Sequence, residues 1–382
     1  MSDEFYQKLT ALRQHLHQHP ELSLQEYQTT DLIKEKLQAL GIPLVATNLK
    51  TGVVAELGPD TGITIGLRAD IDALPITEAT TLTYRSLNPG VMHACGHDFH
   101  TASLLGAAAL LKQAEHQLTG KIRFIFQPAE ENFSGAKLVI ADGHLNGLDA
   151  LVGLHNNPSI PIGSFGIREQ QVMASVDRFT IKIKGAGSHA ASPHLGSDPI
   201  VTASQLISQA QAFIPRHVNA NQAAILSFTQ IHAGTTWNVI PEEVFIEGTL
   251  RTYDKTVRKD LKQLIDNLVE KLPAIYQQTG TIDWISGPPA LHNDAQLTKR
   301  IRENLQTFAQ VIEPPASLGG EDFAFYQKHV PTFFALVGAG SQYPLHHPAF
   351  TIDDRALVFG VEFYYQAALT LIQQHTLEPL NG

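Results

Sequence analysis

The chain changes its structural pattern twice, and these changes limit the folds that it can adopt. Over residues 1–160, and again after residue 288, apolar strand-like stretches alternate with amphipathic helix-like stretches, which is typical of a sheet with parallel strand pairs and helices on both faces. Residues 177–287 instead follow the order strand, helix, strand, strand, helix, strand, which is the split βαβ module. We therefore expect a three-layer α/β/α domain built from residues 1–176 and 288–382, interrupted by an inserted βαββαβ (ferredoxin-like) domain at residues 177–287.

The composition excludes several classes of partner. The 382 residues carry a net charge of -10, which would repel nucleic acids and anionic membrane surfaces. No uncharged apolar run reaches the roughly 18 residues that span a bilayer, so we expect no membrane segment. Cys95 is the one cysteine in the sequence, and a chain that cannot form an internal disulfide fits a reducing cytoplasm.

Polar residues gather at one edge of the expected sheet. In open α/β sheets, ligands bind beyond the carboxyl ends of the strands. Polar side chains end or follow four of the expected strands: Asp70, Glu130 with Glu131, His155, and, across a Gly/Ser/Pro loop, His346 with His347. The turn Cys-Gly-His-Asp at residues 95–98 precedes a helix expected to begin near residue 100, so it belongs to the same edge. We expect these distant segments to converge.

The side chains at this edge suit a metal. Thiolate, imidazole and carboxylate ligands together favour zinc or a similar divalent ion. Cys95 and His97 can face one centre because Gly96 lets the backbone bend between them. Glu130 and Glu131 would point apart in an extended chain, so we expect one to bind the metal and the other to act as a general base toward water. A cysteine packed as a small apolar residue and a solvated pair of acids are the alternatives.

A second polar group lies in the expected inserted domain and comprises His189, Asn238 and Arg251. Arg251 ends a strand, where a fixed guanidinium could bind a carboxylate through two parallel hydrogen bonds. From spacing alone, a surface salt bridge at Arg251 and a locally bonded turn at His189 stay open.

Taken together, these segments resemble the M20 metallopeptidase family, in particular its amidohydrolase branch. That branch includes hippurate hydrolases, N-acyl-amino-acid amidohydrolases, N-acetyldiaminopimelate deacetylases and plant auxin-conjugate hydrolases. The resemblance runs over nearly the whole chain and is carried by RQHLHQHPELSLQEYQT, LRADIDALPI, MHACGHDFHTA, FQPAEE, HAASPHLGSDPI, NVIPEEVFIEGTLRT, GGEDFAFY and LHHPAF. It implies a zinc-exopeptidase-like catalytic domain and an inserted lid domain through which two chains form a homodimer.

The resemblance also implies roles for individual residues. It implies two divalent metal ions, zinc or manganese with cobalt or nickel possible, held by Cys95, His97, Glu131, His155 and His346. The choice of His346 over His347 comes from the family pattern. Glu130 matches the general base, and Asp70 matches an acidic residue that orients the metal cluster. The substrate-contacting positions match His189, Asn238 and Arg251, and in related enzymes the histidine reaches the active site of the partner subunit.

The implied activity is hydrolysis of the amide bond of an N-acyl-L-amino acid of the hippurate or N-acetyl type, which releases a carboxylic acid and the free amino acid. Glu130 would take a proton from the metal-activated water and deliver it to the leaving nitrogen. His189 and a metal would stabilise the oxyanion, while Arg251 and Asn238 would hold the substrate carboxylate. The chain departs from the family pattern at Ser188 and lacks a glycine often found after the two acids, which bears on substrate preference.

Three other functions remain open at this stage. The first is a dipeptidase or aminopeptidase on the same fold, which assays of N-acyl amino acids beside free dipeptides would distinguish. The second is a hydrolase that uses Cys95 as a nucleophile with a histidine base, which predicts indifference to chelators and a covalent acyl-enzyme. The third is a binding protein without catalysis. The paired acids argue against it, and full turnover by a Glu130→Gln variant would eliminate the general-base mechanism.

Overall fold

The computed structural model describes residues 2–374, which form two compact units. Unit 1 comprises Met1–Val172, His292–Pro315 and Asp322–Gly382, and unit 2 comprises Met173–Leu291 and Ala316–Glu321. Unit 2 therefore also holds residues 173–176, 288–291 and 316–321, which the sequence pattern places in the α/β/α domain. Each unit has its own hydrophobic core.

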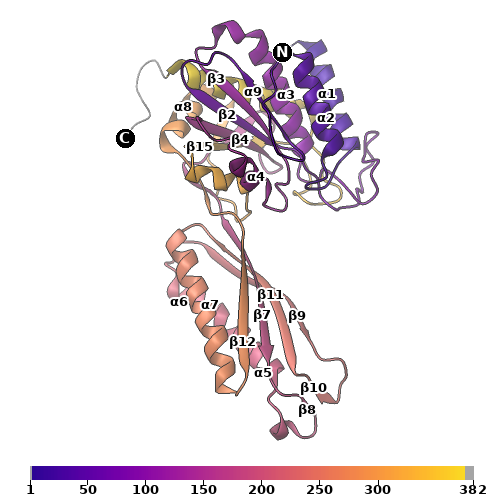
Figure 1. Cartoon of the computed structure of the whole chain (residues 1–382), viewed down its shortest axis with the longest axis vertical. Coiled ribbons are helices and arrows are strands. Elements are labelled where there is room, and N and C mark those ends of the chain that lie inside the picture. Colours follow the sequence, from indigo (N-terminus) through magenta and orange to yellow (C-terminus); the bar gives the residue numbers. More distant parts are fainter. Residues whose placement is uncertain (1, 375–382) are drawn as a thin grey trace. The chain divides into compact units, whose positions relative to one another are not determined.

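A seven-stranded mixed sheet forms the centre of unit 1 (Figure 1), with the strand order β1-β3-β2-β4-β15-β5-β14. The strands are β1 (Val53–Leu57), β2 (Thr64–Asp70), β3 (Lys121–Gln127), β4 (Ala150–Asn157), β5 (Ser164–Gly166), β14 (Gln310–Ile312) and β15 (Thr332–Gly338). Strands β3, β2, β4 and β15 are parallel, so their carboxyl ends meet at one edge. Strand β1 pairs with β3, and β5 with β15, in the antiparallel direction. The chain also forms the short pair β6 (Gln170–Met173) and β13 (Leu291–Asn293).

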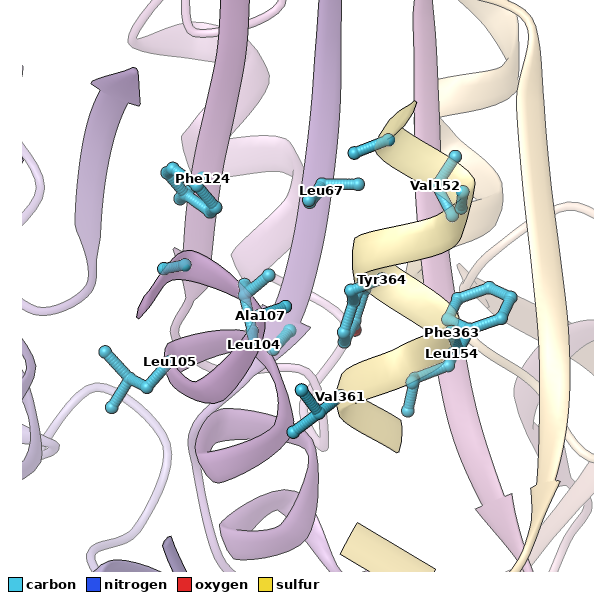
Figure 2. Packing of buried hydrophobic residues seen from close by; sticks show 14 of the residues in the cluster. Leu67, Leu104, Leu105, Ala107, Phe124, Val152, Leu154, Val361, Phe363 and Tyr364 are labelled. Atoms are coloured by element: carbon cyan, nitrogen blue, oxygen red, sulfur yellow. The ribbon is translucent and has the colours of Figure 1, made fainter. Parts of the chain in front are cut away.

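Helices cover both faces of this sheet, which confirms the expected three-layer α/β fold. On one face, α3 (His97–Gln113) and α9 (Leu357–Gln374) pack Leu104 and Tyr364 toward the strand that carries Leu67 (Figure 2). On the other face, Phe323 fills the space left by Gly153, where a Cβ would lie 2.8 Å from the ring.

Unit 1 also contains further helices and short helical turns besides α3 and α9. They are α1 (Asp3–Gln18), α2 (Tyr27–Ala39), η1 (Glu115–Gln117), α4 (Gly135–Ala141), α8 (Ala295–Leu305), η3 (Asp322–Lys328) and η4 (Asp354–Ala356). Between residues 2 and 374, no helix has both the length and the apolar character needed to cross a bilayer.

Unit 2 is built on a four-stranded antiparallel sheet with the order β12-β7-β11-β9. Its elements are β7 (Ser175–Lys184), α5 (Pro199–Gln211), α6 (Phe213–His217), β9 (Ala224–Ala233), β11 (Glu243–Thr252), α7 (Lys255–Ile275) and β12 (Thr279–Ser286), with β8 (Ser188–His189), η2 (Pro193–Leu195) and β10 (Val239–Ile240) besides. Alternate residues of β7, Phe179, Ile181 and Ile183, pack in a core with α5 and α7, whereas Lys182 and Lys184 are exposed. The alternating sequence pattern thus produces the βαββαβ arrangement, with β8 and β10 paired at one end of the unit (Figure 1).

Candidate metal centre

A glycine shapes the turn that carries Cys95 and His97. Gly96 has a φ of 85°, a left-handed conformation that residues with a side chain rarely adopt. Its carbonyl accepts the N–H groups of Phe99 and His100, so Gly96 caps α3 and the helix begins at His97 instead of near residue 100. A Cβ at Gly96 would lie 2.4 Å from Nδ2 of Asn156. The glycine therefore permits both the bend and the close approach of strand β4.

Five of the residues singled out in the sequence lie together at the carboxyl edge of the unit 1 sheet. Cys95 Sγ is 3.4 Å from His155 Nε2 and 3.3 Å from His346 Nε2. Glu131 Oε1 is 3.8 Å from His97 Nε2 and 3.7 Å from His346 Nε2. Two compact groups of potential metal ligands result, and both contain Cys95: Cys95 with His97 and His155, and Cys95 with Glu131 and His346.

Hydrogen bonds orient two of these histidines. His97 Nδ1 lies 3.2 Å from Asp72 Oδ1, and His155 Nδ1 lies 2.7 Å from the carbonyl of Asn156. Because neutral imidazole carries one N–H, donation from Nδ1 makes Nε2 the nitrogen that carries a lone pair. Within residues 2–374, the buried His97 Nε2 and Glu131 Oε1 have no hydrogen-bond partner. A cation between these two atoms would satisfy both, so the residues present fit a metal.

The structure distinguishes His346 from His347. The backbone of His346 has a φ of 65°, and its N–H donates to the carbonyl of Ala94 at 2.8 Å, which keeps the residue beside Cys95. His347 is engaged in its own turn, where Nδ1 accepts the N–H of Ala349 and the ring stacks on Tyr343 at 4.6 Å between centroids. His346 faces the cluster, and His347 does not take part in it.

Glu130 and Glu131 have different surroundings although they are neighbours. Both place a carboxylate oxygen near His97. Glu130 Oε1 accepts the backbone N–H of Asp322 at 3.2 Å, which holds this carboxylate in place. Burial raises the pKa of Glu131 to about 7, and its Oε1 has no hydrogen-bond partner in the described chain. The unpaired Oε1 of Glu131 suits a metal ligand, and the held carboxylate of Glu130 suits proton transfer.

The cluster carries an excess of buried acidic groups. Burial, together with the nearby Glu131 and Glu130, raises the pKa of the Cys95 thiol well above its usual value. Burial opposes protonation of His97, but Asp70 and other carboxylates outweigh it and raise the pKa of this ring to about 10. A bound divalent cation would reverse both tendencies, because it stabilises a thiolate and neutral imidazole ligands.

Asp70 lies beside two histidines. Its Oδ1 is 2.5 Å from His100 Nδ1 and 3.8 Å from His97 Nε2, and its Oδ2 accepts from Arg68 at 2.6 Å. His100 Nε2 in turn accepts the backbone N–H of Asn156 at 2.9 Å, so both ring nitrogens are occupied. Burial lowers the pKa of His100 to about 3, which keeps the ring neutral. His100 therefore supports the strand end that carries His155, and it is not free to bind a metal.

Sequence reasoning missed Asp72 and His100. Asp72 bonds His97, and its two oxygens accept the N–H groups of Glu130 and Glu131, each at 3.1 Å. Two signals could have found these residues. Asp72 lies two residues after Asp70 and shares its face of an extended chain. His100 lies three residues after His97 and shares its face of a helix.

Two of the residues predicted to bind substrate are adjacent in unit 2. His189 and Asn238 come together because β8 pairs with β10 and the N–H of Ala190 donates to the carbonyl of Asn238. His189 is exposed, and its Nδ1 accepts the N–H of Ala191 at 3.0 Å. In the neutral ring Nε2 then carries the proton, so His189 is a hydrogen-bond donor.

Arg251 lies far from His189 within the same unit. Strand β11 begins at Glu243, at the end of unit 2 where β8 and β10 pair, and Arg251 lies eight residues further along the strand. At about 3.3 Å per residue, Arg251 is about 25 Å from Glu243. Its guanidinium donates to Thr249 Oγ1 at 3.2 Å and to the carbonyl of Leu318 at 3.4 Å. Unit 2 thus does not bring the three predicted residues into one group.

Comparisons with known proteins identify the family. Residues 66–370 match the model of peptidase family M20/M25/M40. The chain is 50% identical over 370 residues to N-acetyl-L-cysteine deacetylase of Bacillus subtilis, covering 96% of this chain and 89% of the relative. It is 43% identical over 381 residues to N-acetylcysteine deacetylase of the same organism, covering 98% and 99%. The crystal structure of the Bacillus subtilis YxeP protein, described as a dinuclear metal binding peptidase from the M20 family, matches with a TM-score of 0.88 at 41% identity, covering 97% of this chain and 99% of that one.

The fold and the family define the class of the protein as a hydrolase that acts on amide bonds. The chain belongs to peptidase family M20/M25/M40.

Proposed function

We propose that the protein is a metal-dependent amidohydrolase that cleaves the amide bond of N-acyl-L-amino acids and releases a carboxylic acid and the free amino acid. The observation that carries this proposal is the convergence of one thiol, three imidazoles and one carboxylate in two groups that share Cys95. The names of the two deacetylases, at 50% and 43% identity, support an N-acyl amino acid as substrate, with acetyl among the acyl groups.

The proposed metal centre holds two divalent cations, with zinc or manganese as the first candidates and cobalt or nickel compatible with the same donors. The residues that would hold them are Cys95, His97, Glu131, His155 and His346. When bound, the cations supply Lewis acidity, which lowers the pKa of water and polarises the scissile carbonyl. The similarity to YxeP, a dinuclear metal binding peptidase, supports this number of ions.

Glu130 is the proposed general base. Its carboxylate lies beside the candidate ligands, and the Asp322 N–H holds it in place, so it can take a proton from water and return it to the leaving nitrogen. Asp72 supports this role because it holds the N–H of Glu130 and the ring of His97 at the same time.

The proposed substrate contacts imply a homodimer. Arg251 would bind the substrate carboxylate, with Asn238 nearby, and the Nε2–H of His189 would donate to the developing oxyanion. About 25 Å of strand separates Arg251 from Glu243, which begins β11 at the end of unit 2 that carries His189, so one small substrate cannot touch both Arg251 and His189 of one chain. We infer that His189 and Asn238 of one protomer complete the site that the other protomer's Arg251 serves. The edge strand β9 of unit 2 is available for pairing with a second copy.

We also place the enzyme in the cytoplasm, where a reducing environment keeps the buried thiol of Cys95 available as a ligand. The alternative of a Cys95 nucleophile is disfavoured by the raised pKa of this thiol, because activated cysteines have a lowered pKa.

A substrate panel tests the proposed function. The zinc- or manganese-loaded protein is assayed with N-acetyl and N-benzoyl amino acids, with the same acyl amino acids blocked as carboxyl amides, and with free dipeptides. We expect turnover of the N-acyl amino acids, a loss on blocking the carboxylate, and inactivation by a chelator that added metal reverses. Faster turnover of free dipeptides would favour a dipeptidase or aminopeptidase instead.

A further inference from the structure

Two buried carboxylates hold three consecutive backbone N–H groups in the turn that follows β3. The N–H of Ala129 donates to Glu26 Oε1 at 2.8 Å. The next two N–H groups, of Glu130 and Glu131, donate to the two oxygens of Asp72 at 3.1 Å each. The turn that presents both candidate functional acids is therefore fixed from outside, by residues that lie far from it in the sequence.

This turn needs such support because its backbone is strained at Ala129. Ala129 has a φ of 55°, a left-handed conformation that is unfavourable for a residue with a Cβ. The residue persists in that conformation only if its surroundings compensate. The bond from its N–H to Glu26 is such a compensation, and it sets the direction in which the chain enters Glu130.

The side chain of Glu26 does not cap the helix that begins after it. Glu26 is the N-cap residue of α2, but its side chain makes no capping hydrogen bond there. The N–H groups of Gln28 and Thr29, the second and third residues of α2, donate to the carboxylate of Glu21 instead. The side chain of Glu26 is fully buried, and its second oxygen accepts the hydroxyl of Thr51 at 2.8 Å. Burial of a carboxylate is costly, and the hydrogen bonds from Thr51 and from the turn before Glu130 offset that cost.

We propose that Glu26 is a positioning residue for the paired acids: by accepting the N–H of Ala129, it holds the turn in which Glu130 faces the substrate and Glu131 faces the metals. Glu26 acts through the backbone and does not touch the reacting atoms. The inference rests on the proposed function of this site, and it gives the N-terminal segment of the chain a role in positioning the turn that carries the two acids.

Two substitutions separate the hydrogen bond from the charge. Glu26→Gln removes the charge but keeps an oxygen at the same reach, so Ala129 retains its acceptor. Glu26→Asp keeps the charge but is one methylene shorter, so the bonds from Ala129 and Thr51 are both lost. Glu21→Asp is the matched control, because it shortens an acid whose carboxylate accepts N–H groups at the start of α2. For each variant we would measure kcat, KM for an N-acetyl amino acid, and the Zn²⁺ dissociation constant of the metal-free protein by competition with a chromophoric chelator.

We expect Glu26→Asp to lower kcat by about tenfold to a hundredfold and to weaken Zn²⁺ binding, because a displacement of about 1 Å at catalytic groups has effects of this size. KM should change little, since Glu26 does not contact the substrate. Glu26→Gln and Glu21→Asp should stay within about threefold of the wild type. If Glu26→Asp also stays within that range, or if Glu26→Gln loses as much as Glu26→Asp, the positioning role is wrong. A wild-type protein that cleaves no N-acyl amino acid would instead contradict the proposed function, and the Zn²⁺ constants would still test the role of Glu26.

Discussion

At the scale of single residues, the adjacent acids Glu130 and Glu131 differ in their contacts. Glu130 is held by the N–H of Asp322, while Glu131 has an unpaired oxygen facing His97 and His346. The same type of side chain thus acquires two environments within one turn. This difference underlies our assignment of Glu130 to proton transfer and Glu131 to metal binding.

Substitution of each acid by glutamine should therefore have a different effect. We expect Glu130→Gln to lower kcat by about 10²–10⁴-fold, the usual contribution of a general base, with metal content unchanged. Glu131→Gln should lower the bound metal per chain as well as the activity. Elemental analysis of the dialysed variants beside steady-state kinetics checks both. Loss of metal from Glu130→Gln with normal retention in Glu131→Gln would reverse the assignment.

The sequence indicated which residue types meet at the site, but not every role. From the positions of the expected strand ends and of the turn before α3, we predicted that Cys95, His155 and the two acids would lie at one edge of the sheet. The structure places these residues together at that edge. The preference for His346 over its neighbour came from family resemblance, because two adjacent histidines in a loop are equivalent until the backbone is known. Asp72 was missed because its function consists of hydrogen bonds to segments that are distant in sequence.

At the scale of elements, α1 is tied to the first turn of α3 by a buried ionic network. His17 Nδ1 lies 2.8 Å from Asp98 Oδ2, and its Nε2 lies 3.4 Å from Glu78. Arg13 approaches the same Asp98 oxygen at 3.6 Å. Because Asp98 directly follows His97, this network holds the helix start that carries a candidate ligand. Burial lowers the pKa of His17, but Asp98 and Glu78 outweigh it and raise the pKa to about 9.

The raised pKa of His17 predicts how pH affects stability. Since the folded pKa exceeds the unfolded value of about 6.5, the stabilisation is complete below pH 6.5 and is lost as the pH rises through about 9. A shift of this size corresponds to about 3 kcal/mol. The difference in thermal midpoint between the metal-free wild type and His17→Gln should therefore shrink from pH 6 to pH 9.5. His15→Gln, on the exposed side of the same helix, is the control. A difference that does not change with pH would contradict a charged His17.

The glycine between the two candidate ligands gives a second prediction at this scale. Gly96→Ala would place a residue with a Cβ in a left-handed conformation, at a cost of about 1–2 kcal/mol, and would push against Asn156. Asn156 holds the carbonyl of Cys95, so the turn should shift. We expect a lower thermal midpoint and weaker Zn²⁺ binding by chelator competition. Unchanged Zn²⁺ affinity would show that the turn tolerates a different backbone.

The pattern of helices and strands was largely predictable, because apolar periodicity distinguishes the two elements. The direction of each strand was not predictable, because apolar alternation is the same in parallel and antiparallel strands. The antiparallel pairing of β1 with β3, and of β5 with β15, appeared only in the structure. The start of α3 was expected too late, because Gly96 does not resemble the usual polar N-cap.

At the scale of the whole molecule, the separation of Arg251 from His189 requires a second chain in our account. This can be tested with two variants that are each inactive, His189→Ala and Glu130→Gln, co-expressed with different tags. If His189 acts across the dimer, each mixed dimer has one intact site, and a random mixture should regain about a quarter of wild-type activity. If His189 acts within its own chain, the mixture should show no more activity than the two variants measured separately.

The central claim is that a pair of divalent ions at one edge of the sheet carries out the reaction, and a metal titration tests it most directly. Metal-free protein is titrated with Zn²⁺ or Mn²⁺ while bound metal and N-acetyl amino acid hydrolysis are followed together, with Glu130→Gln in parallel. We predict that activity reaches its maximum at two ions per chain, and that Glu130→Gln binds the same two ions without turning over substrate. Full activity in the metal-free protein, or metal binding that persists when Cys95 and Glu131 are both replaced, would contradict the account.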